Sequence, residues 1–342
     1  LLALAAPVLG LRTGMPSIKV LPDSASARVG YHDIQSAFGV GAPGTIQIVT
    51  PTGEASAAAN LVSRDPGIAT TIAAMPSSNG RWQLIQAVPT VGPSDPALGT
   101  TIDRLRHDLP VGTLVGGAAV ENHDLQHLLT VKTPLVIGVV LALGFLLLLV
   151  ALQAPLAAAL GVLTNLLAVG AAFGVARLIF QDGHGAGLLG FSSQGFLDAW
   201  APVFFFAMIF AISMDYTVFL LSSAKEHYDR SGDPREAAIG GLAHSGRVIF
   251  AAAAVMVAVF FTFALSGPLP PKEMGVILGI AVLLDAFLVR LLLLPVFLRL
   301  SGRAAWWLPA WLDRILPEVR FGHGDAPSDV PAPTDRVPAG VR

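Results

Sequence analysis

The pattern of hydrophobic and polar positions divides the chain near residue 130. From Pro134 onward the mixed pattern ends and long apolar runs take its place. A helix needs about 20 apolar residues, with a range of 17–25, to cross a hydrocarbon core of about 30 Å. The sequence therefore predicts transmembrane spans over residues 135–152, 156–180, 199–221, 248–265 and 274–298, within a bundle of residues 131–300. Residues 1–16 begin with the apolar stretch Leu1–Leu11, which we interpret as the end of a truncated sixth span.

Residues 17–130 show shorter, mixed patterns. The alternation over Thr45–Thr50 is typical of a strand, and Asp95 followed by Pro96 indicates the start of a helix. Short strands interleaved with helices predict a separate α+β domain. Helices are expected over residues 24–38, 54–63 and 96–108, and strands over residues 45–50, 68–74 and 81–88.

Lysine and arginine are distributed unevenly among the loops between the predicted spans. The segment Ser222–Gly246 is rich in them, as is the segment after residue 298, whereas the loop Gln181–Asp198 contains none. Basic residues in short loops favour the cytoplasmic side. We therefore expect Ser222–Gly246 and residues 301–342 to be cytoplasmic, with disorder after about residue 322, and residues 17–130 to lie on the outer side.

Composition supports a polytopic membrane protein. Only 13% of the residues are charged and 54% are hydrophobic, whereas soluble domains contain about 25% charged residues. The absence of cysteine excludes disulfides and thiolate metal sites. A net charge of −2 argues against a nucleic-acid partner, and the sequence has no P-loop motif. We expect neither a cofactor nor a metal.

One acidic residue, Asp215, lies inside the otherwise apolar stretch between Trp200 and Leu221, and Tyr216 follows it directly. A carboxylate near the bilayer centre costs roughly 2.5–3.5 kcal/mol on insertion scales, so such a residue is a candidate functional site. We expect burial to favour its neutral form and Asp215 to act as a proton acceptor. The alternative is a structural hydrogen bond to a neighbouring helix.

Further polar residues in the spans are candidates for supporting roles. Ser213 and Thr217 flank Asp215 and could tune its hydrogen bonding or satisfy backbone carbonyls. Asp285 and Arg290 are five residues apart, about 140° around an α-helix. We therefore expect them not to pair along one helix, so each needs a partner elsewhere, in a structural ion pair or in a relay.

Two other patterns have simpler interpretations. Gly170 and Gly174 form a G-x-x-x-G pattern that lets another helix approach closely. His123 and His127, beside Glu121 and Asp124, have a spacing that a metal site could use, but we interpret them as a solvated helix face.

Residues 211–222 resemble the S-M-D-Y-x-V-F-L-L-S signature of the MMPL (mycobacterial membrane protein large) branch of the resistance-nodulation-division (RND) superfamily. Other stretches agree in order and spacing with the second of that family's two repeats. They are G-D-x-R-E-A at 232–237, G-R-V-I at 246–249, F-A-L-S at 263–266, L-L-D-A-F-L-V-R at 283–290 and W-W-L-P-x-W-L-D at 306–313.

This resemblance implies the C-terminal half of a multi-pass exporter in the bacterial cell membrane, driven by the proton gradient. The expected fold is mainly α-helical, an RND-type bundle of five complete spans plus the remnant of a sixth, with residues 17–130 as an extracytoplasmic α+β porter domain. Asp215 and Tyr216 would form the proton relay, Tyr216 bonding to the first repeat. The expected partners are a lipid or other hydrophobic substrate, the bilayer, the missing N-terminal repeat and a further copy in a homo-oligomer.

Two other functional classes remain for comparison. A regulatory or scaffold membrane protein of the same superfamily would have lost transport, and the intact Asp215–Tyr216 pair argues against it. An intramembrane hydrolase would need a paired nucleophile or a motif such as H-E-x-x-H, and no predicted span has a histidine in its interior. We therefore expect a transporter and not an enzyme.

Overall fold

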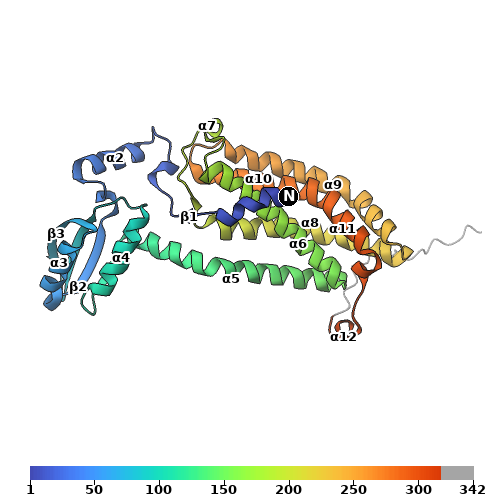
Figure 1. Ribbon diagram of the computed structural model, residues 1–342, viewed down its shortest axis with the longest axis horizontal. Coiled ribbons are helices and arrows are strands. Elements are labelled where there is room, and N and C mark those ends of the chain that lie inside the picture. Colours follow the sequence, from blue (N-terminus) through green and yellow to red (C-terminus); the bar gives the residue numbers. More distant parts are fainter. Residues whose placement is uncertain (317–342) are drawn as a thin grey trace, which may run out of the picture.

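The computed structural model describes residues 1–316, except for the side chains of residues 238, 241–245, 247 and 248. It consists of an α+β domain and a helical bundle, which the long helix α5 (Ala118–Leu152) connects (Figure 1). The disorder predicted after residue 322 lies outside the described residues.

The α+β domain contains a four-stranded antiparallel sheet in the order β3-β4-β2-β5. Three of its strands were predicted from the sequence and are confirmed. The fourth, β5, has only three residues, too few for an alternating pattern. The strands are β2 (Ile46–Pro51), β3 (Ile68–Pro76), β4 (Trp82–Pro89) and β5 (Leu114–Gly116).

The predicted helices of this domain are also confirmed: α2 (Ser26–Phe38), α3 (Ala55–Arg64) and α4 (Pro96–Asp108). Helix α4 begins as expected, because the Asp95 carboxylate accepts a hydrogen bond of 2.9 Å from the Ala97 backbone N–H. The apolar faces of α3, α4 and the sheet form one buried core, which includes Ile46, Ile48, Ile85, Val62 and Ile102. Short 3₁₀ turns connect these elements: η2 (Ile18–Val20), η3 (Ala42–Gly44) and η4 (Thr52–Glu54).

The bundle is built from helices that lie alongside one another, and α5 joins them with its C-terminal part (Figure 1). In chain order they are α1 (Leu2–Ala5) with η1 (Ala6–Gly10), α5, α6 (Pro155–Ala176) with η5 (Arg177–Gln181), α8 (Ala201–Ser231), α9 (Pro234–Ala264), and α10 (Leu269–Leu284) with η6 (Asp285–Leu293) and α11 (Leu294–Ser301). A short 3₁₀ segment, η7 (Gly302–Trp306), extends the last of these runs, and the shorter α7 (Ala186–Leu189) and α12 (Ala310–Asp313) lie outside them.

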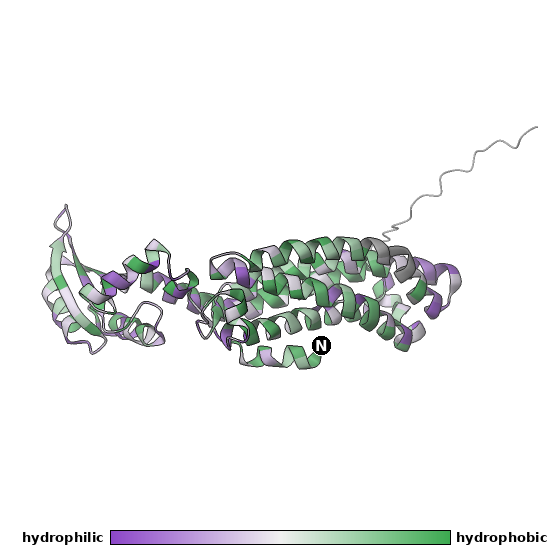
Figure 2. Cartoon of the chain, turned by 90° about the horizontal axis from the view of Figure 1, so that it is seen from above, coloured by the Kyte–Doolittle hydropathy of each residue, from purple (hydrophilic) through white to green (hydrophobic). Residues whose placement is uncertain are grey.

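Four helical segments within residues 1–316 are long and apolar enough to cross a membrane: Ala118–Leu152, Pro155–Gln181, Ala201–Ser231 and Leu269–Trp306. The span predicted over residues 248–265 corresponds to Ile249–Ala264 of α9, an apolar stretch shorter than the other four. Hydrophobic residues dominate the bundle, and hydrophilic ones gather at its end away from the α+β domain (Figure 2). The chain is thus a mainly helical protein with several candidate membrane spans.

Helices α8 and α9 form a longer hairpin than the sequence pattern indicated. Residues 222–246 were expected to be a loop, but they are helical except around Gly232, which turns with φ +66°. Pairs one turn apart, Lys225–Asp229 and Glu226–Arg230, support the polar end of α8. The expectation failed because these charged residues end the apolar pattern without ending the helix.

Helix α1 packs against α6 at the G-x-x-x-G pattern. A Cβ atom at position 174 would lie 1.8 Å from the Leu4 carbonyl oxygen, and one at position 170 would lie 3.6 Å from the Ala5 Cβ. The predicted close approach of another helix is therefore confirmed, and Gly174 is the residue that permits it.

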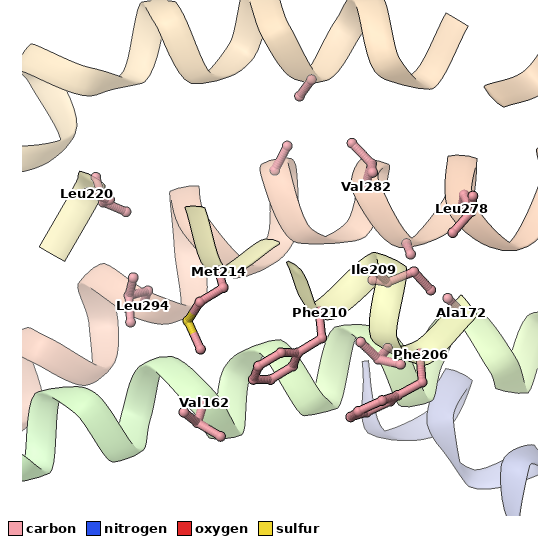
Figure 3. Close-up of a cluster of buried hydrophobic side chains, with 14 of the residues drawn as sticks. Val162, Ala172, Phe206, Ile209, Phe210, Met214, Leu220, Leu278, Val282 and Leu294 are labelled. Atoms are coloured by element: carbon pink, nitrogen blue, oxygen red, sulfur yellow. The ribbon is translucent and has the colours of Figure 1, made fainter. Parts of the chain in front are cut away.

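The bundle core lies between α6, α8, α9 and the last span. Figure 3 shows side chains of α6, α8 and the last span meeting there, among them Val162, Phe210, Met214 and Val282. This core fixes the inner face of α8, and so determines which of its polar residues point inward.

Candidate functional site

The last span changes its helical geometry where its charged residues lie. Segment η6, Asp285–Leu293, is a π-helix, which forms hydrogen bonds between residues i and i+5. Residues five apart therefore stand one above the other, and Arg290 Nε and Nη2 donate to Asp285 Oδ2 at 2.8 and 2.6 Å. The expectation that these residues cannot pair along one helix is wrong, because it assumed α-helical geometry.

Arg290 also contacts residues of α8, the helix that faces it. Its Nη2 donates to the Ser213 backbone carbonyl at 2.5 Å and contacts the Ser213 hydroxyl at 3.1 Å. Its guanidinium carbon lies 5.2 Å from the centre of the Tyr216 ring, a distance at which a cation–π interaction stabilises the pair. Both Arg290 and Asp285 are buried. One buried cluster thus contains Ser213, Tyr216, Asp285 and Arg290.

The remaining polar groups around the cluster have simple partners. The Tyr216 hydroxyl donates to the Met256 sulfur of α9 at 3.3 Å, and the Thr217 hydroxyl donates to the Ser213 carbonyl at 2.9 Å. Thr217 therefore satisfies a backbone carbonyl, one of the two roles expected for it. A void of about 10 Å³ borders Ser213, Tyr216, Asp285 and Arg290, roughly the space that one water molecule needs.

Asp215 lies outside this cluster. It is halfway along α8, but its side chain is exposed on the flank of the bundle. Within residues 1–316 it makes no hydrogen bond or ion pair. The burial expected for this carboxyl group is therefore not provided by the described part of this chain.

The histidine pattern does not form a metal site in the described residues, where no group of three or more suitable side chains comes together. His123 Nε2 lies 3.1 Å from Oδ1 of Asp103 in α4, while the His127 side chain is exposed. Asp124 accepts two hydrogen bonds from Arg106, at 2.6 and 2.7 Å. These residues attach the start of α5 to the α+β domain.

Among the buried residues of the bundle that sequence reasoning did not single out, three are ionisable: Asp198, Lys272 and Glu273. Asp198 precedes the apolar run of α8, and the other two are the fourth and fifth residues of α10. All three residues lie at the ends of apolar runs, where charged loop residues are ordinarily found. The sequence pattern therefore gave no sign that they are buried.

The chain matches proteins of one family along nearly its whole length. The sequence profile of the MMPL family matches residues 19–332. The chain is 36% identical to the membrane protein SCO6666 of Streptomyces coelicolor, over 97% of this chain and 47% of that protein. It is 34% identical to the mycolic acid-containing lipids exporter MmpL11 of Mycolicibacterium smegmatis, over 94% of this chain and 35% of the exporter.

A third relative is the heme uptake protein MmpL11 of Mycobacterium tuberculosis, which is 33% identical over 94% of this chain and 35% of its own length. The chain spans less than half the length of these curated relatives. The profile covers both the α+β domain and the bundle that carries Asp215 and Arg290. On this evidence the chain is a multi-pass membrane protein that belongs to the MMPL family.

Proposed function

We propose that this chain is the C-terminal half of an exporter that uses the proton-motive force to move lipids or other hydrophobic molecules. In this proposal Asp215 and Tyr216 belong to the proton relay, and the proton gradient, not a bound cofactor, supplies the energy. One proton moving down 100 mV supplies about 2.3 kcal/mol, before any contribution from a pH gradient.

The observation that carries this proposal is the exposed carboxyl group of Asp215 in the middle of α8. A carboxylate facing lipid at that depth would cost roughly 2.5–3.5 kcal/mol. A protein surface that covers it removes this cost and provides a partner for proton exchange. The first repeat of a two-repeat transporter would be that surface, and a second copy of this chain is the alternative partner.

The buried cluster of Ser213, Tyr216, Asp285 and Arg290 also supports the proposed relay. Tyr216 is adjacent to Asp215 in the sequence, and its ring lies against Arg290. Because Asp285 and Ser213 fix the guanidinium, the Tyr216 ring is held against a permanent positive charge, one position along α8 from Asp215. A change in the charge of Asp215 would then alter the electrostatic balance at Tyr216 and move α8 relative to the last span.

The substrate is proposed only as a class. The names of the relatives refer to mycolic acid-containing lipids in one case and to heme in another, and both are large hydrophobic molecules. The proposal therefore extends to hydrophobic molecules in contact with the bilayer.

The test is Asp215→Asn in a protein that also carries the first repeat. The amide keeps the size and hydrogen-bonding ability of the side chain but cannot titrate, so proton-driven export in proteoliposomes should fall to background while membrane insertion is retained. Asp229→Asn is the matched control, since Asp229 lies on the same helix in an exposed pair with Lys225.

Undiminished export by Asp215→Asn would refute the relay. Absence of proton-driven export in both the parent protein and the control would instead favour the regulatory or scaffold alternative.

A further inference from the structure

A second group of carboxyl side chains lies at the end of the bundle nearest the α+β domain. Strand β6 (Leu197–Asp198) pairs in parallel with β1 (Thr13–Gly14) there, and α10 begins beside α7 (Figure 1). Asp198 and Glu273 belong to these two segments, and their carboxyl groups are close enough to interact electrostatically. Neither is accessible to solvent, each having a relative exposure of 0%.

The two carboxyl groups have few hydrogen-bonding partners. Both carboxyl oxygens of Glu273 and Oδ2 of Asp198 lack a hydrogen bond of good geometry within the described residues, and the Asp198 backbone N–H is the donor near the Glu273 carboxyl group. Oδ1 of Asp198 accepts a long contact of 3.4 Å from Gln194 Nε2, and the Trp200 side chain is a second donor near this carboxyl group. A buried carboxylate without donors is strongly disfavoured, and two neighbouring ones are disfavoured further by mutual repulsion.

The charged groups around this pair are engaged elsewhere. Lys272, next to Glu273, donates to the Leu189 carbonyl. Arg177 of η5 donates to the Pro7 carbonyl at 2.6 Å and lies 3.7 Å from Asp182. Arg12, before β1, is exposed. No ion pair to either carboxyl group is found in residues 1–316, so a cation from the protein does not neutralise them.

We propose that Asp198 and Glu273 form a proton-binding carboxyl pair that holds one shared proton at the end of the bundle nearest the α+β domain. Two interacting acids in an apolar site bind and release protons as a unit, and the form that carries one proton replaces repulsion by a hydrogen bond. Burial also raises the pKa of Asp198 to about 6, and hydrogen bonding from Gln194 and Trp200 offsets this only in part. The pair would thus exchange protons in a physiological range of pH.

This site is distinct from the cluster around Arg290. Glu273 and Asp285 are separated by 12 positions of the last span, which corresponds to about 18 Å along a helix. The pair also lies where three segments distant in sequence meet: β1, β6 and the start of α10. Strand β6, which contains Asp198, pairs with β1, and the Ser17 backbone N–H donates to Gln194 Oε1 at 2.7 Å. Its protonation state would therefore affect how α10 is held against the start of α8.

The experiment is infrared difference spectroscopy of this chain in lipid nanodiscs, titrated from pH 4 to 9 with sodium as the only metal ion. The carboxylic acid C=O band of Asp198 is isolated as the difference between the wild type and Asp198→Asn. Its titration is then measured again in the Glu273→Gln background. Coupling predicts that loss of Glu273 shifts this titration by about one pH unit or more.

Asp182→Asn is the control, because Asp182 lies near the same end of the bundle but faces Arg177. It should leave the titration of Asp198 unchanged. An Asp198 titration that is the same with and without Glu273 would overturn the proposal. So would a band that responds to added sodium or calcium and not to pH, which would assign the pair to a metal cation. The readout is protonation and not export, so the result does not depend on the proposed transport.

Discussion

At the scale of single residues, Arg290 is a buried charged side chain with several partners in the bundle. It is 2% exposed, bonded to Asp285 and Ser213, and placed over Tyr216. Burying an ion pair costs desolvation energy that its attraction often only balances, so an apolar pair of similar volume could fold as well. The presence of this pair in an apolar span therefore makes it a candidate for a role other than stability.

This interpretation predicts the result of a double-mutant cycle. Asp285→Leu and Arg290→Met should each destabilise the chain by about 3–5 kcal/mol, because each leaves one buried charge unpaired. The double variant should recover most of that loss. Thermal unfolding of the purified chain in detergent measures the stability, and losses that simply add in the double variant would show that the pair is not a unit.

Export by the double variant in a two-repeat protein separates the two roles of the pair. A structural ion pair predicts that export returns together with stability, whereas a part in the relay predicts that export remains lost.

Asp198 predicts a dependence of stability on pH. Burial raises its pKa from 3.8 to about 6 in the folded protein, so between these values the folded state binds more protons than the unfolded state. The stabilisation is complete below about pH 4 and is lost as the pH rises through 6, by about 3 kcal/mol at about 1.4 kcal/mol per pKa unit. The unfolding midpoint of the wild type relative to Asp198→Asn should therefore fall across this window, and a constant difference would contradict the raised pKa.

At the scale of secondary-structure elements, the π-helix η6 determines which residues of the last span face each other. The apolar pattern correctly predicted a helix through residues 285–293, but hydrophobic residues dominate every side of it and conceal a change from i+4 to i+5 bonding. The elements of the α+β domain were easier to predict, because strand alternation and the Asp95 cap depend on local chemistry. The pairing of β1 with β6 joins residues far apart in two-residue strands, which no local pattern reveals.

The contact of α1 with α6 predicts different outcomes at two glycines of the same helix. Gly174→Ala should destabilise the chain by about 1–3 kcal/mol, because its Cβ would overlap the backbone of α1 at Leu4. Gly170→Ala is the matched control. Its Cβ makes an ordinary contact, and alanine favours a helix over glycine by about 1 kcal/mol, so stability should be unchanged or higher. Equal effects of both changes in thermal unfolding would contradict this account.

At the scale of the whole molecule, the α+β domain and the turn between α8 and α9 lie at opposite ends of the structure (Figure 1). The distribution of lysine and arginine predicts that the domain is outside the cytoplasmic membrane and the turn inside. Because the chain has no native cysteine, single cysteines report the topology without background.

In intact cells an impermeant maleimide should label Ser78→Cys, in the exposed turn between β3 and β4, and leave Ser231→Cys unlabelled until the membrane is permeabilised. Labelling of Ser231→Cys from outside would reverse the predicted orientation.

Helix α5 gives this arrangement a mechanical consequence. Its 35 residues form one helix, with Pro134 in its interior, from the α+β domain into the bundle, about 52 Å long at 1.5 Å per residue. The pairs Arg106–Asp124 and Asp103–His123, between α4 and α5, attach the N-terminal end of α5 to the domain. A tilt of about 5° at the bundle end of such a rod displaces the other end by about 4–5 Å, a distance comparable to one helical turn. Small rearrangements among the packed helices would thus be amplified into larger displacements of the α+β domain.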